Sequence, residues 1–305
     1  MLSIKQFVQK GLTSGFLKLP SINSNRIDPS SPSIFNYEPL TSNLFFNFRH
    51  EWIQSFIRNS SGRYQFLWVD SIDQIVNPTP SMTVAWQTKL TTNRSELPVI
   101  LKREESTDNN DDDYLRVQYI EPTEEINLRR LADERTRFWK KYFSSREKVE
   151  FLSSKQNQFD INYRFSSDTE PYNLEMIQSN NSNSSLDLSL NINHTLISLL
   201  FDSQMKCLHP LLTPHQIGIK ATLKTTELSL YISKLLTYKY RLRVVRVIDR
   251  DIDDYIPFHI KLDDNSLKTG VCSVWNRDTQ LNEEVHVKLV AKRLADYFKA
   301  LDDFV

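Results

Sequence analysis

Clustered cations are the side chains of this sequence whose types and spacing most clearly suggest chemistry. One group lies along one side of a predicted helix over residues 126–143: Arg129, Arg130, Arg137, Lys140 and Lys141. A second group surrounds one predicted strand, opposite an acidic run at 249–254: Lys234, Lys239, Arg241, Arg243 and Arg246. Such cations bind phosphate groups or the carboxylates of a protein partner. The alternative is that they only keep the surface solvated.

These groups supply the candidate binding residues. Arg137, Lys140 and Lys141 are the candidate nucleic-acid contacts. The candidate partner contacts are Arg241, Arg243, Arg246 and Arg277. The formal net charge of zero argues against tight binding of nucleic acid by the chain alone.

The sequence lacks the clusters that catalysis or metal binding requires. It holds only five glycines in 305 residues, and none lies between Gly62 and Gly218, so a loop that cradles phosphate is hard to build. The two cysteines, Cys207 and Cys272, define neither a disulfide framework nor a metal site, and the six histidines are scattered. No nucleophile, base and orienting group cluster along the chain. We therefore expect no enzyme activity, no cofactor and no metal.

The elements that position the second cation group form an α/β unit over residues 206–305. Strands are predicted at 216–220, 242–248, 256–261 and 271–275, the second as a buried strand because of its β-branched run. Helices are predicted around Leu228 and Ile232, and at the end of the chain, where apolar residues share one face: Val287, Val290, Ala291, Leu294, Phe298 and Leu301. A turn region is expected before Gly270. This order predicts a mixed sheet with helices packed on it.

Residues 36–205 are predicted to form a second, α+β domain with an antiparallel sheet. A helix is expected at 44–57, where Leu44, Phe48, Trp52 and Phe56 recur every fourth residue, and another at 195–205. Strands are expected at 64–69, 82–90, 97–101, 114–120, 160–165 and 186–190. The third and fourth of these surround an acidic tip and predict an antiparallel hairpin.

Arg135 is the exception on the 126–143 helix, because it falls within the apolar stripe. Its neighbours on that stripe include Leu128, Leu131, Trp139 and Tyr142. An unpaired buried guanidinium costs several kcal/mol, so we expect Arg135 to be buried and paired with a carboxylate or with backbone carbonyls.

Three details of residues 206–305 resemble the anticodon-binding domain of class II aminoacyl-tRNA synthetases of the glycyl and prolyl kind. They are Leu208, Pro210 and Pro214 in a Leu-x-Pro-x-x-x-Pro pattern, the strand Ile256-Pro257-Phe258, and the turn Leu267-x-x-Gly270 that leads to Arg277-Asp278-Thr279. Together with the aromatic and basic run at 137–142, these residues also resemble the accessory subunits of mitochondrial DNA polymerase gamma. The resemblance extends from about residue 36 to residue 305. The alternative is an unrelated α/β domain that carries these residues by coincidence.

Within the synthetase resemblance, the ATP-binding motifs are incomplete. Arg103 and Glu105 beside the hairpin look like motif 2, whose Arg-x-Glu pair binds ATP and the amino group of the amino acid; a charged hairpin shoulder is the alternative. Motif 3 needs glycines and an arginine at the strand-to-helix junction, but the junction at 190–196 has no glycine and places His194 at the arginine position. Histidine has no bidentate fork and is largely neutral at pH 7. We expect His194 to be structural.

The resemblance implies a non-catalytic processivity factor for mitochondrial DNA replication. Such a factor binds the catalytic subunit of the DNA polymerase, largely through its C-terminal domain, and tightens the hold on primer-template DNA. The competing interpretations are a divergent mitochondrial class II synthetase and another tRNA-binding pseudo-synthetase.

The first 27 residues suggest the compartment. They carry Lys5, Lys10, Lys18 and Arg26 but no acidic residue, which resembles a mitochondrial transit peptide; a disordered tail is the alternative. We expect a protein of the mitochondrial matrix and nucleoid. No apolar run approaches the roughly 20 residues that a membrane span needs.

The interval at 70–96 bears on the oligomeric state. Vertebrate relatives carry an extra pair of long helices there that builds a dimer. Pro78 and Pro80 would break a helix early, and two helices with their loops need about 25–30 residues. We expect a monomer that pairs one-to-one with the polymerase.

Overall fold

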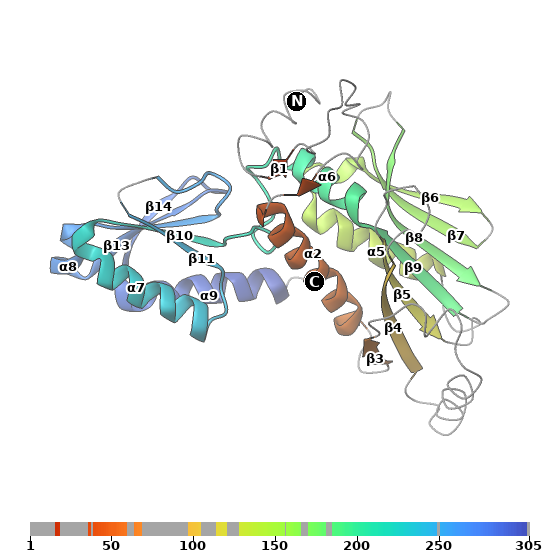
Figure 1. The fold of residues 1–305 in the computed structure, drawn as a ribbon, viewed down its shortest axis with the longest axis horizontal. Coiled ribbons are helices and arrows are strands. Elements are labelled where there is room, and N and C mark those ends of the chain that lie inside the picture. The colour runs from red at the N-terminus through yellow and green to blue at the C-terminus, as the bar shows by residue number, and fades with distance from the viewer. Residues whose placement is uncertain are drawn as a thin grey trace.

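Two large sheets, each with its own hydrophobic core, make up most of the described structure (Figure 1). The computed structural model describes residues 16–18, 36–37, 39–59, 64–68, 97–104, 114–120, 128–155, 157–165, 170–180, 185–248 and 251–303. The fold is α+β, as expected, with an antiparallel sheet in the front half and a mixed sheet in the C-terminal part. A short pair, β1 (Leu17–Lys18) with β2 (Asn36–Tyr37), precedes them.

The sheet of the front half has seven strands in the order β3-β4-β5-β9-β8-β7-β6. Their bounds are β3 Tyr64–Trp68, β4 Leu97–Glu104, β5 Tyr114–Ile120, β6 Val149–Lys155, β7 Gln158–Tyr163, β8 Tyr172–Asn180 and β9 Ser185–Asn191. All neighbouring strands are antiparallel except β3 and β4, which are parallel. The antiparallel pairing of β4 with β5 confirms the predicted hairpin. The strand expected at 82–90 lies outside the described residues.

Two strands of this sheet, β6 and β8, were not predicted from the sequence. The reason in β8 is a register shift against β7, between Ile161 and Asn162. Leu174 and Glu175 are consecutive and both fully buried, so the apolar alternation that identifies a strand is interrupted. In β6 the exposed Leu152 follows Phe151 and breaks the same alternation.

Three helices cover the face of this sheet that is turned toward the C-terminal unit (Figure 1). They are α2 (Pro39–Asn59), α5 (Leu128–Tyr142) and α6 (Ile192–Asp202). The stripe of α2 is buried as expected, at Leu44, Phe48, Trp52 and Phe56. None of the described helices is long and apolar enough to cross a membrane.

Helix α6 is displaced by three residues from the predicted range 195–205. It begins early because the Asn191 side chain caps it by accepting a hydrogen bond from the backbone N–H of His194. It ends early because Gln204 and Met205 adopt positive φ angles of 51° and 58°. The chain therefore turns toward the C-terminal unit before the predicted end of the helix.

The C-terminal sheet has five strands in the order β11-β10-β12-β13-β14. The bounds are β10 Ile217–Ala221, β11 Val244–Ile248, β12 Phe258–Leu262, β13 Val271–Asn276 and β14 Asn282–His286. Strands β11, β10 and β12 are parallel, whereas β13 and β14 are antiparallel, so the sheet is mixed as predicted. Helices α7 (Thr226–Lys234) and α9 (Val287–Asp303) pack on one side of it (Figure 1).

Three local expectations for this unit were wrong. β11 is an edge strand rather than a buried one, and its Arg246 and Ile248 are exposed. β14 was missed because only Val285 of its five residues is buried. The segment before Gly270 is a helix, α8 (Asp264–Thr269), capped by Asp263 and ended by Gly270 with a φ of 70°.

The two units also share packing. Tyr255 and Ile256 precede β12 but belong to the core of the front half, where Phe16 contacts the Tyr255 ring edge-on. Asn47 of α2 donates hydrogen bonds to the carbonyls of Leu212 and Thr213. The C-terminal unit is therefore fastened to α2.

Candidate functional site

The centre of the helix-covered face is a buried charge pair, which confirms the expectation for Arg135. Arg135 is 2% exposed and its Nε lies 3.0 Å from Oε1 of the fully buried Glu175 in β8. Its Nη1 donates to the Ser55 hydroxyl at 2.6 Å. The indole N–H groups of Trp52 and Trp139 also donate to the Glu175 carboxylate. Three donors on three side chains thus hold one carboxylate in the core.

Aromatic rings pack against the Arg135 guanidinium. The Arg135 guanidinium lies 4.2 Å from the Phe56 ring centre and 4.3 Å from that of Phe138. Phe48 packs against both Phe138 and Trp139. Aromatic rings therefore surround the pair of Arg135 and Glu175 in the described part of this face.

His194, at the motif 3-like junction, is held by the fold. Its Nδ1–H donates to the carbonyl oxygen of Asn173 at 3.0 Å. Its ring stacks on Tyr172 with 4.6 Å between ring centres. These contacts support the structural role expected for His194.

The motif 2-like residues can be placed only by backbone register. Arg103 pairs with Leu115, Leu115 with Leu190, and Leu190 with Glu175. Arg103 thus shares the register row of the buried pair. Glu105 lies outside the described residues, so the Arg-x-Glu pair stays a prediction.

Arg277 joins two of the sequence segments that carried the family resemblance, its own and the one that contains Leu208. Arg277 is 6% exposed and its Nη1 donates to the carbonyls of Lys206 and Tyr255, while Nη2 donates to Leu208. Asp278 accepts from Nε at 2.7 Å. Arg277 is an internal clamp, so the predicted partner contact does not fit its position.

Arg243 has a similar internal role. Its side chain donates to the carbonyls of Leu211 and Thr213 at 2.7 and 3.1 Å. Burial lowers the pKa of Arg243 to about 10, and the nearby Glu51 partly opposes that shift. Its guanidinium fastens the start of the C-terminal unit instead of facing a partner.

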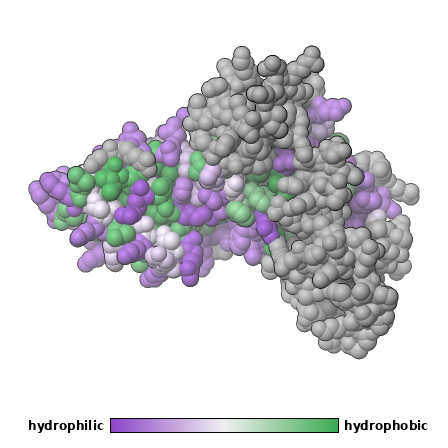
Figure 2. All heavy atoms as spheres, in the orientation of Figure 1, coloured by the Kyte–Doolittle hydropathy of each residue, from purple (hydrophilic) through white to green (hydrophobic). Residues whose placement is uncertain are grey.

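Arg241 and Arg246 are exposed, as a partner contact requires. They follow, along the chain, an exposed stripe of α7 and of the π-helical turn Leu235–Lys239 that continues it: Tyr231, Lys234 and Tyr238. We call these five residues the cationic–aromatic face. Figure 2 shows hydrophobic and hydrophilic side chains intermixed on the C-terminal unit. Tyrosine and arginine are the residue types that protein interfaces favour.

Two backbone features mark the cationic–aromatic face further. The π-helical turn is of a kind found often at functional sites. Arg241 has a φ of 59°, a conformation that costs free energy for a residue other than glycine. The sequence signal that was missed is the spacing of Tyr231, Lys234 and Tyr238, which lie opposite the buried Ile232 and Leu236.

The three candidate nucleic-acid contacts on α5 differ in exposure. Arg137 is exposed on α5, and its Nε donates to the Asp133 carbonyl. Lys140 and Lys141 are half-buried. Lys141 lines a pocket of about 280 Å³ between α5 and the C-terminal unit, whose other walls include Arg146, Cys207, His209 and Arg277.

His209 in this pocket is neutral because of its surroundings. Burial, followed by the charges of Lys141, Arg277 and Arg146, lowers the pKa of His209 to about 4. Its Nδ1 accepts from the Leu211 backbone N–H, and its ring contacts Tyr142 edge-on.

The lowered pKa of His209 predicts that the protein loses stability at acid pH. The unfolded chain takes up a proton at pH values near 6.5, but the folded chain resists it until about pH 4, so stability is lost as the pH falls through this window. Between pH 7 and pH 4, the free energy of unfolding should fall by about 3 kcal/mol more in the natural chain than in His209→Gln. Urea unfolding at several pH values measures this, and parallel curves for the two proteins would contradict it.

Comparison with known proteins adds no assignment. No protein-family model matches the chain, and no curated protein matches it. Among the described residues, no group of histidine, cysteine, aspartate or glutamate side chains could hold a metal ion.

Proposed function

We propose that this protein is a non-catalytic accessory subunit of a mitochondrial DNA polymerase of the gamma type. In this proposal the C-terminal unit docks on the catalytic subunit through the cationic–aromatic face, and α5 lies toward primer-template DNA. The observation that carries the proposal is the combination of a partner-type exposed surface with a front half whose central charges are buried and paired. The protein would act in the mitochondrial matrix, as a monomer that pairs with one polymerase.

The front half supports this role as a scaffold derived from a class II synthetase. A synthetase needs an arginine at the start of the helix after the last sheet strand, to hold the triphosphate. Here that place is taken by His194, whose ring is engaged with Asn173 and Tyr172. A scaffold that keeps its binding unit but lacks this clamp is better suited to an adaptor than to an enzyme.

The second candidate is a divergent mitochondrial class II synthetase or a tRNA-binding pseudo-synthetase. It is favoured by the C-terminal unit, whose mixed sheet has the order of elements expected of an anticodon-binding domain. Contact with tRNA would use the same exposed cations.

Amino-acid activation separates the two candidates. We expect pyrophosphate exchange into ATP to stay at background with each of the twenty amino acids, because no arginine clamp is present at His194. The His194→Arg variant is a suitable comparison, and it should also stay at background because the junction has no glycine. Exchange clearly above background in the natural chain would contradict the accessory-subunit proposal.

A further inference from the structure

The strand β14 forms one edge of the C-terminal sheet. Among the described strands it has a neighbour, β13, on one side only. Four of its five residues are exposed, and Val285 alone is buried. The outward backbone N–H and C=O groups of such an edge can pair with a further extended chain.

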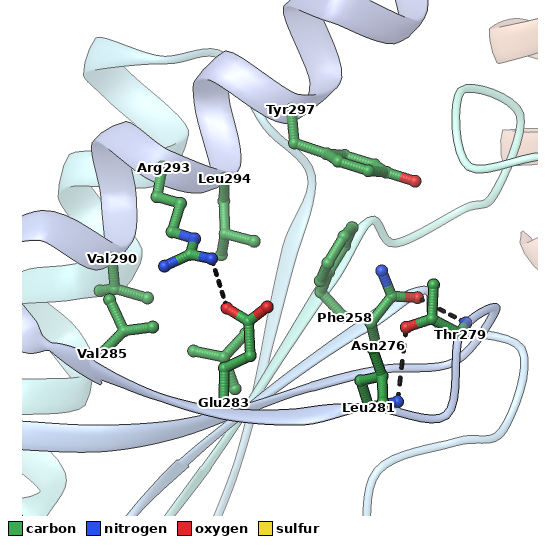
Figure 3. Close-up of a pocket in the computed structure, with 11 residues that line it drawn as sticks. Phe258, Asn276, Thr279, Leu281, Glu283, Val285, Val290, Arg293, Leu294 and Tyr297 are labelled. Carbon is green, nitrogen blue, oxygen red and sulfur yellow. Dashed lines mark hydrogen bonds and ion pairs between the residues drawn. The ribbon is translucent and has the colours of Figure 1, made fainter.

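A pocket of about 240 Å³ lies between the antiparallel strands β13 and β14 and the helix α9 (Figure 3). Most of its lining is apolar: Phe258, Val274, Leu281, Val285, Val290, Leu294 and Tyr297. The side chains of α9 point toward those of the strands, and Arg293 reaches Glu283 at 2.5 Å across the space between them (Figure 3). Pockets for drug-sized ligands measure about 300–1,000 Å³, so this one suits a single large side chain.

The two faces of β14 differ in chemistry. Glu283 and Val285 line the pocket on the helix side. Glu284 pairs with Ser273 and lies on the other face, where it has no ion-pair partner among the described residues. Side chains of a strand added at this edge would alternate between the two faces. Those on the pocket side meet an apolar lining, and those on the other side meet a carboxylate that favours a cation.

We propose that β14 and α9 form an acceptor groove for an extended segment of a protein partner in which apolar side chains alternate with basic ones. This groove is separate from the cationic–aromatic face and does not depend on the partner being a polymerase. The competing role for Glu283 and Glu284 is to keep the edge from pairing with anything.

A labelled peptide tests the groove in the full chain. The probe is a seven-residue fluorescein-labelled peptide in which Lys alternates with Phe, Leu and Val, and a peptide of the same composition with all lysines in one block is its control. Fluorescence anisotropy should show saturable binding of the alternating peptide, about tenfold tighter than the block peptide. Arg293→Trp, which fills the pocket opening, should weaken binding about thirtyfold. Lys292→Trp, an exposed neighbour outside the pocket, should leave it unchanged.

Two further measurements test whether the peptide binds along β14. Glu284→Lys should weaken the alternating peptide about fivefold. Hydrogen exchange should show new protection over residues 282–286 and none at β11, the opposite edge. Equal binding of the two peptides, indifference to Arg293→Trp, or protection at β11 would each overturn the proposal. Arg293, Lys292 and Glu284 are all exposed, so unfolding midpoints near that of the natural chain are expected for the variants.

Discussion

Replacing Arg135 with methionine is expected to destabilise the protein by about 3–5 kcal/mol. The cause is Glu175, which is fully buried and would lose its only cationic partner in the described core while keeping its two indole donors. Urea unfolding followed by far-ultraviolet circular dichroism measures the loss. Arg130→Met is the matched control on the same helix, because Arg130 is 79% exposed and its pair with Glu134 should contribute about 0.5 kcal/mol or less.

One additional result would separate lost charge pairing from lost packing. Adding Glu175→Leu should restore part of the stability, since removing both charges leaves none unpaired. A loss below about 1 kcal/mol in Arg135→Met would contradict the described core.

The second large effect is expected at Arg277. Arg277→Met would leave the carbonyls of Lys206, Leu208 and Tyr255 without the donor that joins them, at a cost of about 3 kcal/mol or more. Arg277→Lys should recover little, because an ammonium group cannot reproduce the planar fork that reaches three acceptors. Arg293→Met, an exposed cation in a surface pair, is the control and should change stability by less than about 1 kcal/mol.

The residues at which Arg277→Met loosens the structure provide a second test. Because the three carbonyls lie where the front half meets the C-terminal unit, hydrogen exchange in Arg277→Met should rise first over residues 206–212 and 255–257. Uniform acceleration over both sheets, or no change near these carbonyls, would show that Arg277 does not hold the junction.

Much of the fold could be predicted because its long helices have clear periodicity. The α5 stripe placed even Arg135 correctly, since a helical phase fixed by six apolar residues of α5 leaves little freedom for the position of Arg135. The edge strand β14 was missed for the opposite reason, because a strand with one buried residue has no periodic signal. The strand β8 was missed because its bulge interrupts the alternation.

The candidate site was predicted only in part. Arginine is usually a surface residue, so Arg243 and Arg277 were assigned to a partner surface together with Arg241 and Arg246. Their actual acceptors are backbone carbonyls from segments 22 to 71 residues away along the chain, and sequence spacing carries no information about such contacts. Only the tertiary fold separates the clamping arginines from the exposed ones.

Primer extension by the cognate catalytic subunit at moderate salt tests the central claim most directly. A chain ending near Met205 would remove Tyr255 and Ile256 from the front core, so surface variants give the sharper comparison. The natural chain should lengthen the products, and Arg241→Glu with Arg246→Glu should abolish most of this stimulation. The control, Lys288→Glu with Lys292→Glu on exposed positions of α9, should stimulate like the natural chain. No stimulation by the natural chain, or equal stimulation by both double variants, would contradict docking through the cationic–aromatic face.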